Sequence, residues 1–225
     1  MATALIIGAG QGLSASVARK LYARGHQIVL AARDTSDLGA LGEETGATLV
    51  DCDAKDRADM ERLFSLLDEM KTDLEVAVYN PSARVRGPIT EVDPVAVENA
   101  ILVSAYGAFL MAQHAARRML PRGRGAMLFT GASAGVKGFA QSASFAMGKF
   151  ALRGLCQSLA RELHPKGIHI GHFVIDGGIA TASTTNEDNG RLDPEAIADT
   201  YMHFLDQPPS AWAWEIELRP WVERF

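Results

Sequence analysis

Short apolar runs alternate with segments of helical periodicity along the whole chain, and this alternation restricts the fold more than any other feature. The runs are almost continuously apolar, which is typical of strands that are buried on both faces of a parallel sheet. They comprise residues 4–7, 28–32, 48–50, 74–79, 126–130, 168–175 and 214–218. Helical spacing marks residues 13–24, 57–71, 94–119, 142–164 and 194–205. The pattern predicts an α/β fold in which a doubly wound parallel sheet of about seven strands carries helices on both faces.

Composition excludes several classes of partner. The chain has 22 basic and 27 acidic residues and a formal net charge of −5, which argues against nucleic acid as a partner. Its two cysteines, Cys52 and Cys156, lie far apart, which fits a reducing compartment and argues against disulfides or a cysteine-bound metal. No run approaches the ~18 apolar residues of a membrane span. We therefore expect a cytoplasmic protein that binds no metal, membrane or nucleic acid.

A glycine-rich turn follows the first apolar run. Gly8, Gly10 and Gly12 stand between this run and the first helical segment, which begins at Leu13. Such a turn lets a pyrophosphate approach the N–H groups at the start of a helix. The spacing departs from G-x-G-x-x-G, because Ser14 or Ala15 stands at the last glycine position. A glycine-rich turn without a ligand is the alternative.

The end of the second apolar run bears on the choice of cofactor. An acidic side chain here would bind a ribose hydroxyl, whereas an arginine accommodates a 2′-phosphate. The chain has Ala32 at the expected acidic position, followed by Arg33 and Asp34. This order favours NADP(H) over NAD(H). Two alternatives stay open: that Asp34 turns toward the ribose, or that Arg33 is only a solvated surface charge.

The order of these motifs resembles the short-chain dehydrogenase/reductase family along nearly the whole chain. The matching segments are Gly8-x-x-x-Gly12-Leu13-Ser14, Cys52-Asp53, Tyr79-Asn80-Pro81-Ser82, Ser104-Ala-Tyr-Gly107, Phe145-x-x-x-Lys149 and Asp176-Gly-Gly-Ile179-Ala-Thr181. The resemblance implies a Rossmann fold, with residues 1–225 forming a single dinucleotide-binding domain. Together with Arg33 from the argument above, it gives a set of cofactor-binding residues, namely Gly8, Gly12, Leu13, Arg33, Asp53, Asn80, Lys149, Ile179 and Thr181.

The family's acid–base residues are mostly replaced. Phe145 stands at the position of its tyrosine, Ala132 at that of its serine and Ser104 at that of its asparagine, whereas Lys149 is retained. A phenyl ring has no proton to donate to a substrate oxygen. The chain therefore resembles an atypical subgroup that lacks the tyrosine and serine. Asp176, at a position where the family has proline, is either a substitute acid or the cap of a turn.

The resulting expectation is an NADP(H)-dependent oxidoreductase that transfers a hydride to or from a small carbonyl- or alcohol-like substrate, with a degenerate acid–base site. The alternative is a catalytically silent NADP(H)-binding protein that acts as a sensor or a partner subunit. The resemblance further implies a homodimer or homotetramer, joined through helices near residues 94–119 and 142–164.

Overall fold

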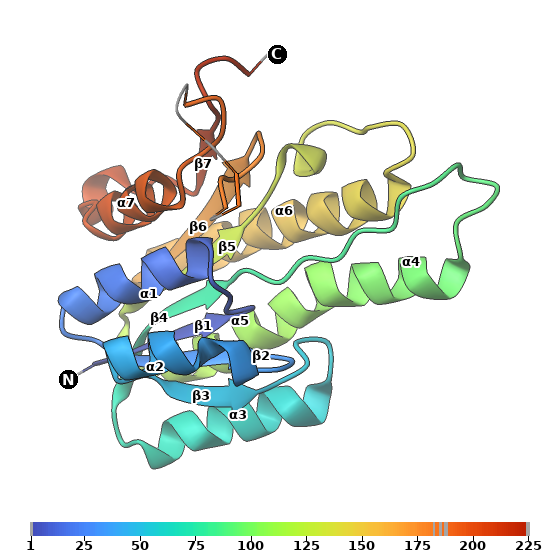
Figure 1. Cartoon of the computed structure of the whole chain (residues 1–225). Coiled ribbons are helices and arrows are strands. Elements are labelled where there is room, and N and C mark those ends of the chain that lie inside the picture. Colours follow the sequence, from blue (N-terminus) through green and yellow to red (C-terminus); the bar gives the residue numbers. More distant parts are fainter. Residues whose placement is uncertain (1, 182, 185, 187–188, 224–225) are drawn as a thin grey trace.

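The computed structural model describes residues 2–181, 183–184, 186 and 189–223. Seven parallel strands form one sheet in the order β3-β2-β1-β4-β5-β6-β7 (Figure 1). The strands are β1 (Ala2–Ile7), β2 (Gln27–Ala32), β3 (Thr48–Asp51), β4 (Asp73–Tyr79), β5 (Gly125–Thr130), β6 (Ile168–Ile175) and β7 (Glu215–Leu218). Every predicted strand is confirmed; β6 has the predicted bounds, and the ends of the other strands differ by one or two residues.

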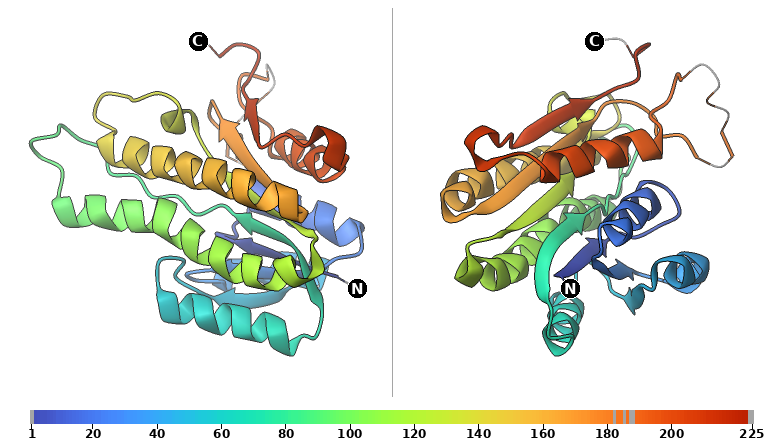
Figure 2. Two further views of the ribbon diagram at one scale, coloured as in Figure 1. Left: turned by 180° about the vertical axis from the view of Figure 1, so that it is seen from behind. Right: turned by 90° about the vertical axis from the view of Figure 1, so that its left-hand side faces the viewer.

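Helices cover both faces of the sheet, as the sequence predicts (Figure 2). They are α1 (Leu13–Ala23), α2 (Gly39–Thr45), α3 (Arg57–Glu69), α4 (Pro94–Ile101), α5 (Gly107–Met119), α6 (Ala143–Leu163) and α7 (Pro194–Leu205). One apolar cluster joins the sheet to α3, α5 and α6, and a second joins it to α1, α2 and α7. The single-domain, doubly wound α/β prediction is therefore confirmed.

Two parts of the helical prediction need correction. The helix predicted over residues 94–119 consists of α4 and α5, separated by a π-helical segment at Leu102–Tyr106. Such segments occur often at functional sites. Helix α2 was not predicted, because its seven residues, GALGEET, include two glycines and too few apolar positions to show a helical period.

The continuous helical stretch Pro94–Arg122 contains α4, the π-helical segment and α5. Within the described residues it is the one helical stretch that is long and apolar enough to span a membrane by length and composition. Core helices of proteins that never enter a membrane pass the same test. Here the helix packs against β4, β5 and α6.

The strand order determines where a ligand can bind. Strand β1 lies between β2 and β4, so the chain leaves the sheet in opposite directions on the two sides of β1. In open α/β sheets, ligands bind at the carboxyl ends of the strands at such a switch point. Gly8 follows β1 and Asn80 follows β4, so the topology brings these two predicted site residues together.

At the opposite, amino-terminal edge of the sheet, His169 is buried among aromatic rings. Its ring stacks on Phe204 and Trp212 at centroid distances of 3.9 and 4.3 Å, and its Nε2 lies 3.0 Å from the carbonyl oxygen of Ala213. Burial lowers the pKa of His169 to about 4. The folded chain therefore keeps this ring neutral at pH values where the unfolded chain protonates it.

Because the folded-state pKa is depressed, the stability due to His169 is present above about pH 6.5 and is lost as the pH falls toward 4. We expect this residue to cause a fall of about 2 kcal/mol in the free energy of unfolding between about pH 7.5 and about pH 5. Urea unfolding of the wild type and His169→Gln at both pH values measures this fall. The variant should lose less stability on acidification, and an equal loss in both proteins would contradict the prediction.

Candidate active site

Two cavities adjoin at the carboxyl edge of the sheet, and both are lined by Asn80 and Ser82. The first has a volume of about 610 Å³, and its wall includes Gly8, Ala32, Arg33, Asp53 and Asn80. The second has a volume of about 630 Å³, and its wall includes Ala132, Phe145, Lys149, Asp176 and Ile179. The structure thus brings most of the predicted site residues into one continuous cleft.

A small hydrogen-bonded cluster joins the ends of β1 and β4. The Ser14 hydroxyl donates to the Gly8 carbonyl at 2.9 Å and accepts from Asn80 Nδ2 at 2.7 Å. Gly8 has φ +77°, and a Cβ there would lie 2.6 Å from the backbone nitrogen of Pro81. The serine that replaces the expected glycine therefore has a defined structural role, since it links the glycine-rich turn to Asn80.

The far end of the first cavity carries Arg33, which is exposed. Among the described residues no carboxylate lies within 4.0 Å of its guanidinium. The neighbouring Asp34 accepts a hydrogen bond from the Ser36 N–H at 2.9 Å. Hydrogen bonding from the side chain and then the backbone of Ser36 lowers the pKa of Asp34. Asp34 is thus engaged within its own loop, while Arg33 remains available to a ligand.

Lys149 lies at the base of the second cavity, on α6. Its side chain is 2% exposed, and Nζ donates to the Thr130 carbonyl at 2.7 Å. Burial lowers the pKa of Lys149 to about 8. The ammonium group is thus held one helical turn from Phe145, at 5.9 Å from the centre of that ring.

The positions of the family's other acid–base residues hold no acid. Phe145 and Ala132 both line the second cavity, and the Phe145 ring is half-buried. Ser104 is fully buried in the π-helical segment, where its Oγ accepts from the Ala83 N–H at 3.3 Å. Its hydroxyl therefore holds the chain that follows β4 and does not line the second cavity.

Three predicted cofactor residues lie outside the walls of the two cavities. Gly12 is exposed at the start of α1, whereas the Leu13 side chain belongs to the apolar core. Thr181 is exposed, and its N–H donates to Thr184 Oγ1 at 2.8 Å.

Asp176 is neutralised by Lys137 and Arg219, whose nitrogens lie 3.3 and 3.4 Å from Oδ2. It is therefore an ion-paired residue, which neither alternative anticipated.

A buried polar group beneath the second cavity was not predicted. His172 Nδ1 lies 2.9 Å from Glu215 Oε2, and Arg153 donates two hydrogen bonds to the same carboxylate. Burial raises the pKa of Glu215, but Arg153 and His172 outweigh this effect and leave the pKa lowered. Gly131 lies directly above, since a Cβ there would be 2.4 Å from His172 Nε2. No local motif connects these residues. The available signal was Glu215, an acidic residue in the last strand, which indicates a buried polar partner.

Sequence reasoning also missed two arginines on the wall of the second cavity, Arg84 and Arg86. They stand two positions apart just after the recognised Asn80 motif, and this spacing in an extended segment was the available signal. No group of three or more His, Cys, Asp or Glu side chains able to hold a metal ion occurs within the described ranges.

Comparison with known proteins agrees with this geometry. A family model described as short chain dehydrogenase matches residues 2–191. The 3-oxoacyl-[acyl-carrier-protein] reductase MabA of Mycobacterium tuberculosis is 29% identical over 180 residues, which are 80% of this chain and 70% of that protein. An uncharacterized oxidoreductase of Staphylococcus aureus is 24% identical over 223 residues, or 96% of each chain. These names favour an enzyme over a silent binding protein.

Solved structures extend the likeness to the whole fold. A short-chain dehydrogenase from Rhodopseudomonas palustris is 33% identical, with a TM-score of 0.86 over 98% of this chain and 99% of that one. A metagenomic short-chain oxidoreductase, solved in complex with NADP, is 24% identical and has a TM-score of 0.85 over 98% of each chain. The second likeness concerns the fold alone. Together with the family match, the first shows that this chain belongs to the short-chain dehydrogenase family of NAD(P)-dependent oxidoreductases.

Proposed function

We propose that the chain is an NADP(H)-dependent oxidoreductase that transfers a hydride to or from a small carbonyl- or alcohol-like substrate. The observation that carries the choice of cofactor is Arg33, which has no carboxylate partner among the described residues and lies beside Ala32 on the first cavity. A guanidinium in this place suits a 2′-phosphate, and the absence of an acid at Ala32 removes the partner of a free 2′-hydroxyl.

The residues of the first cavity fit a dinucleotide. The close approach of Gly8 to Pro81 leaves no room for a side chain, whereas a Cβ on Gly10 or Gly12 would meet no protein atom within 4 Å. The glycine-rich turn therefore faces open space at the start of α1, as phosphate binding requires. We assign cofactor binding within a single domain of residues 1–225 to Gly8, Gly12, Leu13, Arg33, Asp53, Asn80, Lys149, Ile179 and Thr181.

The second cavity supports hydride transfer with little acid–base assistance. A nicotinamide held beside Lys149 and Asn80 would supply or accept the hydride, and in the reducing direction a proton must also reach the substrate oxygen. Lys149 holds a positive charge beside Phe145, where it would stabilise negative charge on that oxygen. Because no phenol or serine hydroxyl stands at Phe145 and Ala132, we place the chain in an atypical subgroup that lacks both. The proton would then come from water or from a group not yet assigned. A missing general acid lowers the rate about 10²–10⁴-fold.

We further propose a cytoplasmic homodimer or homotetramer. Apolar side chains on α4, α5 and α6 are exposed, including Val95, Phe109, Met147 and Phe150. They would become buried if two copies packed through these helices.

Binding of NADPH tests the assignment of Arg33. We expect the purified chain to bind NADPH at least about tenfold more tightly than NADH, because the guanidinium–phosphate contact is charge-assisted. Arg33→Gln should weaken NADPH binding to about the level of NADH and leave NADH binding unchanged. Nicotinamide fluorescence titration measures both ligands, with Lys71→Gln as the control of equal charge change. Equal affinities for NADPH and NADH in the wild type would overturn the assignment.

Reintroducing a tyrosine and a serine in the second cavity tests whether missing acid–base groups limit the reaction. The double variant Phe145→Tyr, Ala132→Ser should raise kcat/KM for small ketones at least about tenfold, since Lys149 is already positioned to lower the pKa of a phenol at residue 145. The rate of NADPH oxidation measures this gain. The triple variant that also carries Lys149→Met is the matched control and should lose it. No gain in the double variant, despite normal NADPH binding, would show that the acid–base groups are not what limits the reaction.

A further inference from the structure

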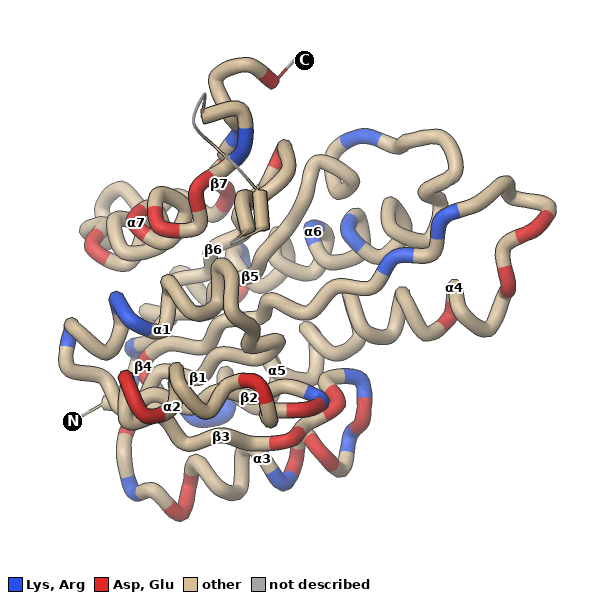
Figure 3. Tube along the Cα trace, in the orientation of Figure 1, with Lys and Arg blue, Asp and Glu red and all other residues tan. Residues whose placement is uncertain are grey.

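The second cavity carries more positive charge than the remainder of the chain would suggest. Its wall contains the cationic side chains Arg84, Arg86, Lys137 and Lys149 and the carboxylates Asp176 and Glu223. The whole chain has a net charge of −5. Figure 3 shows basic positions along the segment between β4 and α4 and in the loop that precedes α6.

One of the two carboxylates is already neutralised. Asp176 Oδ2 lies 3.3 Å from Lys137 Nζ and 3.4 Å from an Arg219 nitrogen. Lys137 therefore belongs to an internal ion pair, which leaves Arg84 and Arg86 as the exposed cations of the wall. Within the ranges that the structure describes, neither of them has a carboxylate within 4.0 Å.

The chain segment that carries the two arginines is held rigidly against α6. Ser144 is 2% exposed, and its Oγ accepts from the Val85 N–H at 3.0 Å and donates to the Val85 carbonyl at 2.9 Å. The Gly87 N–H donates to the Gln141 carbonyl at 3.1 Å. Arg84 and Arg86 both line the second cavity, whereas Val85 between them is held through its backbone by Ser144.

Arg84 is also fixed by its own contacts. Its guanidinium lies 4.9 Å from the centre of the Phe145 ring and donates to Ser142 Oγ at 2.7 Å. Burial lowers the pKa of Arg84, and repulsion from the neighbouring charge of Arg86 lowers it further. Among the residues that the structure describes, Arg84 makes one side-chain hydrogen bond, to Ser142, and Arg86 makes none, so most of their planar donors can serve a ligand.

We propose that Arg84 and Arg86 bind an anionic group of the substrate, a carboxylate or a phosphate, while its reacting oxygen lies toward Lys149. The inference rests on the proposed function for the reaction itself. It narrows the substrate to carbonyl compounds or alcohols that also carry an acidic group. Guanidinium groups suit both anions because their parallel N–H donors match two oxygens at once.

Direct binding of small anions tests this proposal without relying on turnover. Calorimetric titrations use benzoate, phenyl phosphate and the uncharged benzamide, with the chain saturated with NADPH. We expect the wild type to bind at least one of the anions about tenfold or more tightly than benzamide. The tighter anion distinguishes a carboxylate from a phosphate as the preferred group.

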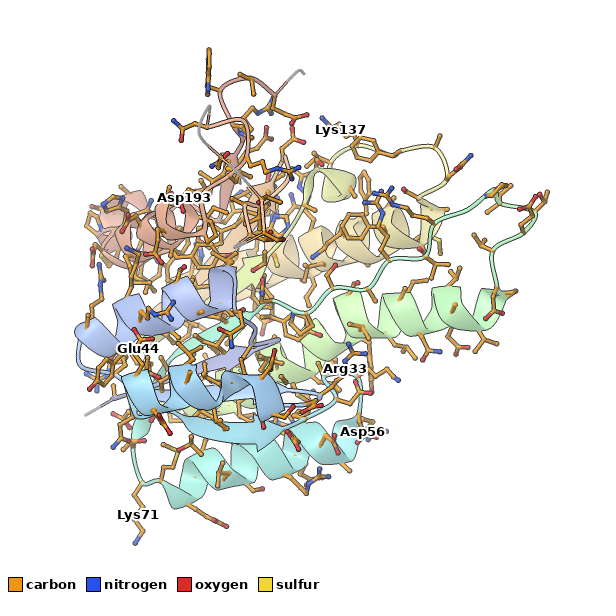
Figure 4. The ribbon with its side chains drawn as sticks, viewed as in Figure 1. Arg33, Glu44, Asp56, Lys71, Lys137 and Asp193 are labelled. Carbon is orange, nitrogen blue, oxygen red and sulfur yellow. The ribbon has the colours of Figure 1, made fainter. Side chains whose placement is uncertain are left out.

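The arginine variants locate the bound anion. Arg86→Gln should weaken binding of the tighter anion about fivefold or more, and Arg84→Gln, Arg86→Gln together about fiftyfold, while benzamide binding stays unchanged. Lys71→Gln removes the same charge at the amino-terminal edge of the sheet, where Figure 4 shows Lys71 far from Lys137, and should have no effect. Since Arg86 has no hydrogen bond or ion pair to lose within the described structure, its variant should fold normally, which thermal unfolding verifies.

The two proposals fail in different ways. If the anions bind no better than benzamide, or if the arginine variants bind them as the wild type does, the anionic substrate is ruled out even though NADPH binds. If NADPH does not bind, the same titrations are made on the chain alone and on Arg33→Gln. Anion binding that depends on Arg86 and not on Arg33 would then support the anionic subsite while contradicting the proposed cofactor.

Discussion

The hydrogen bonds that join the ends of β1 and β4 are the contact on which the rest of the site depends. Ser14, Gly8 and Asn80 close the gap between two strands whose following chains run in opposite directions. A Cβ on Gly8 would lie 2.6 Å from the Pro81 nitrogen, so the turn packs closely on the chain after β4, which then runs along the walls of both cavities. This path leaves one cavity on each side of Asn80 and delivers the segment with Arg84 to the start of α6.

The two cavities differ in how closely they match what the family resemblance implies. The first retains its glycine-rich turn and places Arg33 in the position where a 2′-phosphate would be bound. In the second, Phe145 replaces the expected phenol, and the centre of its ring lies 4.9 Å from the guanidinium of Arg84 and 5.9 Å from the ammonium of Lys149. Two cations thus lie near residue 145, where the family resemblance implies a proton donor. The site therefore suits the stabilisation of negative charge more than the donation of a proton.

Much of the architecture could be predicted because strand and helix patterns are local. Seven apolar runs predicted seven strands, and helical spacing over residues 194–205 predicted α7, at whose start Asp193 accepts from the Glu195 N–H. Helix α2 and the π-helical segment at Leu102–Tyr106 escaped prediction. Helix α2 is too short to show a helical period. The π-helical segment joins α4 to α5 and packs against α6 and the chain after β4, which are contacts that local sequence does not reveal.

By itself, the sequence determined the doubly wound sheet, the place of the glycine-rich turn and the loss of the phenol and serine hydroxyl at residues 145 and 132. Tertiary structure alone decided which side chains meet. The Arg84–Ser142 hydrogen bond spans 58 positions along the chain, and the His172–Glu215 contact spans 43. Local propensity carries no information about such pairs, because they arise only after the order of strands in the sheet has brought distant loops to one edge.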